Sequence, residues 1–279
     1  MMHVFEVYPK VNIFLKILHK EGAYHKLISR MCLVKDKLKD IISVKNALSF
    51  SLKGDFDCPL EKNSLFKALQ ILKNFLKSKN FSHSVIKSLD TLAIEVEKNI
   101  PTQAGLGGGS ADAGGLLYHL NQIFDWRLSL EELYSMGSLV GADTNFFISQ
   151  YKSTNATSYG EVIENFEEEP LEDRLEIYAP NHVFCSTKAV YQAYKPKTCF
   201  SQAKEWLKKP SLECLKTCDR SELNDLLKPA LLTNQALRGI ESELGKEWFF
   251  SGSGSAFFRL KNTQKGANET HCQQQKSLF

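Results

Sequence analysis

The sequence predicts an α+β fold, in which strands and helices are mixed rather than regularly alternating. Residues 10–18 and 92–97 alternate apolar and polar side chains, as half-buried strands do. Residues 63–76 repeat leucine at helical spacing instead. Because these elements do not follow the strand–helix–strand order of a doubly wound sheet, we expect an α+β architecture.

The first expected element is a strand over residues 10–18. Its apolar side chains fall on alternate positions and point to one side: Val11, Ile13, Leu15 and Ile17. This alternation predicts one buried face. The opposite face holds Lys10, Asn12, Phe14 and Lys16, so Lys10 and Asn12 are expected side by side.

A helix is expected over residues 63–76, where Asn63 can cap the first turn. Its apolar stripe consists of Leu65, Leu69, Leu72 and Leu76. The strand over residues 92–97 comes next and ends by Pro101. A glycine-rich loop then leads into a helix from about Ser110 to Phe124.

Another helix is expected from Ser129 to about Val140, because Ser129 and Glu132 have the spacing of a capping box and Gly141 can end the helix. Asp143 follows, and the apolar residues after it are expected to form a strand.

The acidic stretch Glu164–Pro170 is typical of an exposed connector near a domain boundary. We therefore expect an N-terminal domain over residues 1–155 and a C-terminal domain over 156–279. The tail over 261–279 is rich in Gln, Lys and Asn, so part of it is expected to be poorly ordered.

Composition narrows the class of protein. Hydrophobic residues make up 43% of the 279 residues and charged residues 24%, as in globular proteins. The net charge is only +3, without a block of basic residues, so we expect no nucleic-acid partner. Neither a signal peptide nor a run of 18 apolar residues is present, so we expect a cytoplasmic protein with no membrane partner. Cys214 and Cys218, four residues apart, are expected to be reduced thiols rather than metal ligands.

The glycine-rich loop carries the strongest chemical signal. Four of the five residues over 105–109 are glycine, which lets backbone N–H groups approach an anion. The helix behind the loop adds unpaired N–H groups and the positive end of its dipole. Ser110 can cap this helix or donate its hydroxyl to a phosphate oxygen. The Walker A and Rossmann patterns are absent from the sequence. The loop indicates a triphosphate site, and the alternative is a glycine turn without a ligand.

Residues 101–111 resemble the Pro-x-x-x-Gly-Leu-Gly-Ser-Ser-Ser-Ala loop of the GHMP kinases, which include galactose, homoserine and mevalonate kinases. Gly108 and Gly109 replace the first two serines, a form similar to the diphosphocytidyl-methylerythritol kinase branch. Five further segments resemble motifs of the family or the branch: 10–15 (Lys-x-Asn-x-x-Leu), 22–25 (Gly-Tyr-His, with Ala23 inserted), 141–147 (Gly-Ala-Asp-x-Pro-Phe-Phe, with Asn145 for proline), 251–255 (the third glycine-rich motif) and 265–268.

This resemblance implies the two-domain GHMP kinase fold, with the active site in the cleft between the domains. It implies ATP as co-substrate, Mg²⁺, and a small cytidyl alcohol as acceptor. Asp143 is the implied general base and Lys10 the catalytic cation beside it. The implied substrate-binding residues are Asn12, Tyr24, His25 and Tyr191. The implied ATP-binding residues are Pro101, Ala104, Gly105, Leu106, Gly107, Gly108, Gly109, Ser110, Asn63 and Leu65. The resemblance assigns neither metal ligands nor an oligomeric state.

Ordinary structural interpretations remain open for these side chains. Asp143 fits a solvated turn or a helix cap, Lys10 a surface lysine, and Tyr191 core packing. Two other functions also remain open. Another GHMP kinase, acting on homoserine, mevalonate or a sugar, would not need Tyr24 and His25. A nucleotide-binding regulator would not need the Lys10 and Asp143 pair.

Overall fold

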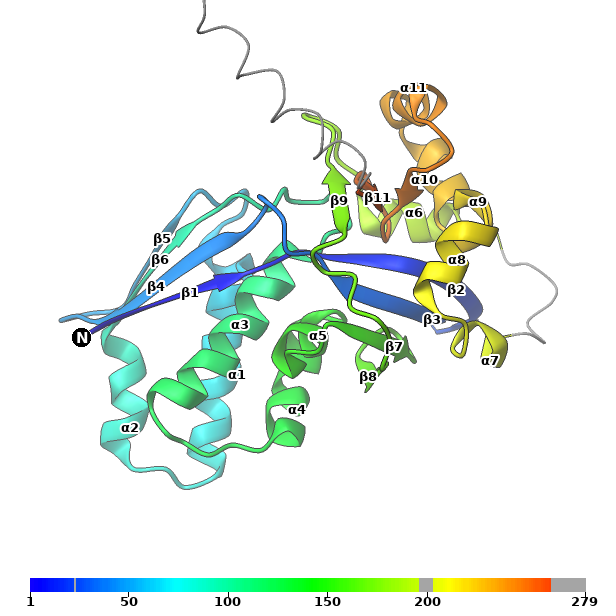
Figure 1. Cartoon of the computed structure of the whole chain (residues 1–279). Coiled ribbons are helices and arrows are strands. Elements are labelled where there is room, and N and C mark those ends of the chain that lie inside the picture. The colour runs from blue at the N-terminus through cyan, green and yellow to red at the C-terminus, as the bar shows by residue number, and fades with distance from the viewer. Residues whose placement is uncertain (23, 196–202, 262–279) are drawn as a thin grey trace, which may run out of the picture.

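The computed structural model describes residues 1–22, 24–195 and 203–261, and it has the predicted α+β architecture. The described strands form three sheets. The first sheet has the order β1-β4-β6-β5, and helices cover one of its faces (Figure 1). Its strands are β1 (Met2–Val7), β4 (Asp40–Asn46), β5 (Ser51–Gly54) and β6 (Leu92–Glu97), of which β6 confirms the strand predicted over 92–97.

Two long helices, α1 (Ser64–Ser78) and α3 (Gly108–Ile123), pack against each other beside this sheet (Figure 1). The strand register brings apolar pairs together, with Phe5 opposite Ile42 and Val44 opposite Ile94. All four side chains are buried. This core holds β6 and α3 rigidly, so the loop that joins them has two fixed ends.

The second sheet has the order β2-β3-β7-β8 and is antiparallel throughout. Its strands are β2 (Lys10–Glu21), β3 (Tyr24–Leu33), β7 (Ser153–Thr157) and β8 (Val162–Asn165). The strand predicted over 10–18 is thus confirmed and extends to Glu21. The proposed division between residues 155 and 156 stays a prediction, and it would fall inside β7.

The expectation of a single buried face on this strand is wrong, since both faces of β2 are covered. Phe14, on the face expected to meet solvent, is fully buried. Its ring centroid lies 5.4 Å from that of Trp206, and the Arg30 guanidinium carbon lies 5.6 Å from it. A bulge between Asn12 and Phe14 also breaks the alternation. The face of β2 that holds Phe14 is covered by C-terminal segments such as the one with Trp206, and no local sequence pattern predicts this contact.

The helix N-termini follow the capping signals in two of three cases. Asn63 caps α1, accepting a hydrogen bond from the Leu65 amide at 2.9 Å. Ser129 and Glu132 form the capping box of α4 (Leu130–Val140). However, α3 begins at Gly108 rather than Ser110, so Ser110 lies in its first turn and is not its cap. The short α2 (His83–Ser88) was not predicted.

The strand expected after Asp143 is instead a helix, α5 (Thr144–Ser149), with all six residues buried. A short buried apolar run has no periodicity that separates a strand from a helix. Close packing makes the helix possible here. A Cβ at Gly137 of α4 would lie 2.2 Å from Asn145 Oδ1, so α5 can approach α4 only because position 137 is glycine.

The third sheet, β10-β11-β9, and several short helices make up the C-terminal part, which lies along β2 (Figure 1). Its elements are β9 (Leu175–Tyr178), α6 (Thr187–Ala193), α7 (Ala203–Trp206), α8 (Ser211–Thr217), α9 (Arg220–Leu223), α10 (Leu227–Thr233), α11 (Gln235–Glu243), β10 (Phe249–Phe250) and β11 (Phe257–Leu260). The predictions for the tail after residue 261 and for the motif at 265–268 lie outside the described residues. Within the described ranges, no helix combines the length and apolar character needed to cross a membrane.

The stretch Glu164–Pro170 is mostly exposed, as expected of a connector, but it also places the side chain of Glu168 in a buried polar network. The Glu168 carboxylate accepts hydrogen bonds from the Ser211 amide at 2.8 Å and the Ser153 hydroxyl at 2.6 Å. It lies 3.7 Å from the guanidinium of Arg30, which is fully buried. Arg30 also donates to Leu207 O at 2.9 Å, so it ties β3 to the C-terminal part.

We expect Arg30→Met to lower the free energy of unfolding by about 3 kcal/mol or more, because it leaves a largely buried carboxylate without its cation. Urea denaturation measures this change. The matched control is Arg127→Met, which removes an arginine that is 81% exposed and pairs with Asp125, two residues away. Its effect should stay within about 0.5 kcal/mol. Equal effects of the two changes would contradict a structural role for the buried arginine.

Candidate active site

The glycine loop between β6 and α3 lies against the turn over residues 251–255. Gly105 and Gly107 both have φ of +74°, a conformation that favours glycine. A Cβ at Gly105 would lie 2.2 Å from the Ser251 carbonyl oxygen. The two segments are joined by hydrogen bonds from Ala256 N to Ala104 O at 2.9 Å and from Ser251 Oγ to Gly105 O at 3.0 Å. The third glycine-rich motif thus packs beside the loop.

The loop opens directly into the N-terminus of α3. The first hydrogen bond of the helix runs from Ala111 N to Gly107 O at 2.8 Å, so the amides before Ala111 have no partner within the helix. Gly109 lies close to α1, since a Cβ there would approach Ser64 Oγ to 3.0 Å. These unpaired amides and the helix dipole provide the anion-binding geometry that the sequence predicts.

Lys10 and Asp143 form an ion pair beside this loop. Lys10 Nζ lies 3.1 Å from Asp143 Oδ2, and it donates to Asn12 Oδ1 at 2.6 Å and to Gly105 O at 3.2 Å. Lys10 is buried, so it is not the surface lysine of the ordinary interpretation. Asp143 precedes α5 but makes no capping hydrogen bond with its side chain. Its side chain is 31% exposed, which leaves the carboxylate open to the cleft.

Asn12 is held in place by the strands around it. Its Nδ2 donates to Ser29 Oγ at 2.8 Å, and the Ser29 hydroxyl donates to Phe14 O at 2.6 Å. The backbone N–H of Asn12 donates to Ser251 Oγ at 3.3 Å. Because the side-chain Nδ2 of Asn12 is bound to Ser29, its side-chain oxygen Oδ1 is turned toward Lys10. The polar face predicted for Lys10 and Asn12 is therefore real, although it is buried.

Aromatic side chains line the other end of the site. The His25 ring lies 5.5 Å from Tyr191 and 5.8 Å from Tyr194, measured between centroids. Tyr24 is 69% exposed and lies 5.7 Å from Tyr159. Burial, aided by the charge of Lys20, lowers the pKa of His25 and favours a neutral imidazole. Burial, and then the charge of Asp143, raises the pKa of Tyr191, so its hydroxyl stays protonated.

The sequence interpretation missed Tyr159 and Tyr194. Tyr159 lies between β7 and β8, and Tyr194 directly follows α6. Neither residue belongs to a recognisable spacing pattern, because only the fold brings them to Tyr24 and His25. A count of aromatic residues near predicted loops would not have separated them from the other tyrosines.

Comparisons with known proteins relate this site to a family of small-molecule kinases. A model of the GHMP kinases N terminal domain matches residues 63–150. A Helicobacter pylori (strain HPAG1) protein named 4-diphosphocytidyl-2-C-methyl-D-erythritol kinase is 96% identical over 274 residues, covering 98% of this chain and all of that protein (100%). The chain belongs to the GHMP kinases. A protein of the same name from Sulfurovum sp. (strain NBC37-1) is 40% identical to this GHMP kinase, covering 94% of this chain and 100% of that protein.

Solved structures share the fold of this GHMP kinase. A crystal structure of 4-(cytidine 5'-diphospho)-2C-methyl-D-erythritol kinase aligns with a TM-score of 0.67 at 23% identity, covering 94% of this chain and 90% of that chain. Homoserine kinase from Cytophaga hutchinsonii aligns with a TM-score of 0.61 at 16% identity, covering 94% and 86%. These low identities show the common fold alone.

One large cleft joins all parts of the site in this GHMP kinase. Its volume is about 2010 Å³, well above the roughly 300–1,000 Å³ of a site for one small ligand, so it has room for ATP and an acceptor together. Most of the predicted residues line it: Lys10, Asn12, Tyr24, His25, Asn63, Pro101, Ala104, Gly105, Gly107, Gly108, Gly109, Ser110, Asp143 and Tyr191. Leu65 and Leu106 do not line the cleft. Their side chains are buried in the core, which leaves them only backbone groups to offer.

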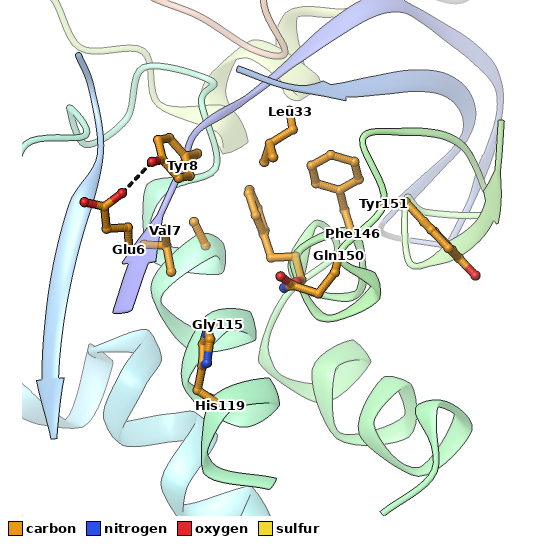
Figure 2. A pocket seen from close by; sticks show the side chains of 11 residues that line it. Glu6, Val7, Tyr8, Leu33, Gly115, His119, Phe146, Gln150 and Tyr151 are labelled. Carbon is orange, nitrogen blue, oxygen red and sulfur yellow. Dashed lines mark hydrogen bonds between the residues drawn. The ribbon is translucent and has the colours of Figure 1, made fainter. Parts of the chain in front are cut away.

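A second cavity has a volume of about 60 Å³ and lies between β1, α3 and α5 (Figure 2). Val7, Gly115, His119 and Phe146 are among the residues around it. This volume accommodates about two water molecules and is far too small for a nucleotide. The large cleft is therefore the candidate active site.

Proposed function

We propose that this kinase transfers the γ-phosphate of ATP to the 2-hydroxyl of 4-diphosphocytidyl-2-C-methyl-D-erythritol, giving the 2-phosphate and ADP, in the non-mevalonate route to isoprenoid precursors. One observation carries the proposal. The ion pair of Lys10 and Asp143 lies in a single cleft with the glycine loop and with the aromatic residues around His25. The names of the relatives at 96% and 40% identity support the same acceptor.

In the proposed reaction, the acceptor oxygen bonds to the γ-phosphorus as the bond from that phosphorus to the bridging oxygen of ADP breaks. Asp143 takes the proton of the acceptor hydroxyl. Lys10 holds the Asp143 carboxylate in place and brings a positive charge to the site where negative charge develops. The unpaired amides of the loop and of α3 bind the phosphates of ATP.

We infer that Mg²⁺ enters with ATP. Among the residues that the structure describes, no three His, Cys, Asp or Glu side chains gather as a metal site. Mg²⁺ commonly keeps several waters and binds through substrate phosphates, which neutralises their charge. The proposal accordingly assigns no carboxylate ligand to Mg²⁺. We also infer that the enzyme works in the cytoplasm, where ATP is available.

The cytidyl end of the acceptor is assigned to the aromatic residues. Tyr24, exposed at the rim of the cleft, offers a face for stacking with the base. A neutral His25 can both donate to and accept from the edge of cytosine. Tyr191 supplies a second aromatic surface beside His25.

Tyr24→Ala should raise the KM for the cytidyl acceptor by about tenfold or more, since base stacking contributes about 1–3 kcal/mol. The KM for ATP should stay within about twofold, because Tyr24 lies away from the glycine loop. Steady-state kinetics with each substrate varied in turn measures both constants. Tyr178→Ala, at a tyrosine of β9 outside the lining of the cleft, is the control. Equal increases in both KM values would rule out a role in acceptor specificity.

The proposed function is tested by ADP release from Mg-ATP with four acceptors: 4-diphosphocytidyl-2-C-methyl-D-erythritol, mevalonate, homoserine and galactose. Turnover with the first alone is expected. Turnover with one of the others would keep the glycine loop as the ATP site but discard the roles of Tyr24, His25 and Tyr191. Absence of turnover by folded protein with all four would contradict the proposed reaction.

A further inference from the structure

The two ends of the glycine loop meet at a buried cluster of three charged side chains. Asp40 begins β4, Lys98 directly follows β6, and Asp112 lies in the second turn of α3. Their side chains are 0%, 9% and 4% exposed. Lys98 Nζ donates to Asp112 Oδ2 at 2.7 Å and also to Asp40 Oδ2. We call these three residues the neck cluster.

The neck cluster also binds the backbone where the loop begins. Asp40 Oδ1 accepts hydrogen bonds from Asn99 N at 2.6 Å and from Ile100 N at 2.8 Å. Ile100 in turn packs on the start of α3, since a Cβ at Gly108 would lie 2.9 Å from Ile100 Cγ2. Through Asp40 and Lys98, the first residues of the loop and the helix that follows it are held together.

One atom of the cluster is left unsatisfied. Asp112 Oδ1 is buried and has no hydrogen-bond partner within the described part of the chain. A buried carboxylate oxygen without a partner is costly, so it favours a state in which it gains a proton. Lys98 and Asp112 both line the large cleft, yet the reaction proposed above uses neither of them.

We propose that Asp40, Lys98 and Asp112 are positioning residues that hold the two ends of the glycine loop together. They make the affinity of the loop for ATP depend on the charge of the neck cluster. The inference rests on the loop as the ATP site, as the proposed function does. It does not depend on which alcohol is the acceptor.

The charge of the cluster is expected to change near neutral pH. Burial raises the pKa of Asp112 to about 7, while Lys98 opposes this shift and Asp40 adds to it. Below this pH the proton on Asp112 leaves one negative and one positive side chain, and the cluster is neutral. Above it the cluster carries one net negative charge, which repels the phosphates of ATP. The affinity for ATP should therefore fall as pH rises through about 7.

Three other charged side chains on elements packed against α3 have partners outside the neck cluster. Glu6 of β1 pairs with Lys39, Lys67 of α1 donates to Val140 O, and Glu132 of α4 pairs with Lys79. The charges that act on Asp112 are those of Asp40 on β4 and of Lys98 after β6. The pH dependence can accordingly be assigned to the neck cluster.

The decisive variant is Asp112→Asn, which keeps the shape of the side chain and an oxygen for Lys98 but cannot ionise. Calorimetric titration with Mg-ATP alone, from pH 6 to 8.5, gives the affinity of wild type and variant. The ratio of the two dissociation constants should change by about tenfold over this range, with wild type the weaker at high pH. The titration of ATP itself is common to both proteins and cancels in the ratio. The kcat of Asp112→Asn at saturating ATP should stay within about threefold of wild type.

Asp90→Asn is the control, because Asp90 forms an exposed pair with Lys73 outside the lining of the cleft. Its affinity for ATP should follow wild type at every pH. If Asp112→Asn followed wild type too, or lost kcat without a change in ATP affinity, the inference would be overturned.

Lys98→Met gives a second measurement, with an expected increase of several fold in the KM for ATP at little cost in kcat. If Lys98→Met does not fold, the comparison of Asp112→Asn with wild type still tests the role of the neck cluster. Since the titrations need no acceptor, wild type that binds ATP but does not turn over the cytidyl alcohol would count against the proposed function alone.

Discussion

Asp143→Asn should lower kcat by about 10³-fold while the dissociation constant for Mg-ATP stays within about twofold of wild type. Asparagine has the same shape and keeps an oxygen for Lys10, but it cannot accept the proton of the acceptor hydroxyl. Asp143 is partly exposed in the cleft, so its replacement should not disturb folding. The loss therefore reports on the proton transfer rather than on binding.

Single-turnover kinetics with saturating substrates, together with calorimetric titration of Mg-ATP, separates these two effects. Asp125→Asn provides the control, since Asp125 is 73% exposed and pairs with the similarly exposed Arg127 two residues away. That variant should behave as wild type. If Asp143→Asn retained more than about a tenth of the wild-type turnover, Asp143 would not be the general base.

Gly105→Ala should weaken Mg-ATP binding by at least about 100-fold and lower the free energy of unfolding by about 2–4 kcal/mol. The new Cβ would lie 2.2 Å from the Ser251 carbonyl oxygen and 2.9 Å from Gly254 N, both backbone atoms. The φ of +74° adds strain for any other residue. Relief requires the loop to move away from the turn over residues 251–255, which misplaces the phosphate-binding amides.

Gly239→Ala is the matched control, because a Cβ at that position in α11 would meet no atom within 4 Å. It should leave ATP binding unchanged and stabilise the protein by up to about 1 kcal/mol. Urea denaturation and Mg-ATP titration of both variants make the comparison. Wild-type affinity for ATP in Gly105→Ala would mean that the loop does not hold the phosphates.

Local signals were sufficient for much of the fold. The alternation over residues 92–97, the cap at Asn63 and the capping box of Ser129 and Glu132 all reappear in the structure. These features depend on residues within one turn or one strand of each other, so the interactions that form them can be predicted from neighbouring residues in the sequence. The glycine loop could be recognised for the same reason, because its residues are consecutive.

The predictions failed where contacts between segments far apart in the sequence determine the local structure. The strand β2 was expected to have a solvent face, but Trp206 and the buried Arg30 cover Phe14. Likewise, α5 was expected to be a strand, but its approach to Gly137 allows a helix. In both cases the deciding contact joins residues whose positions no local pattern relates.

The amino-acid order alone therefore predicted the α+β class, indicated a phosphate-binding loop and, through resemblance, indicated the pair of Lys10 and Asp143. Only the tertiary structure decided that Lys10 is buried 3.1 Å from Asp143 and that Tyr159 and Tyr194 join the site. It also decided that Lys98 and Asp112 meet at the neck of the loop. Propensity and capping act over a few residues, whereas the burial and charge of a side chain depend on every segment that folds against it.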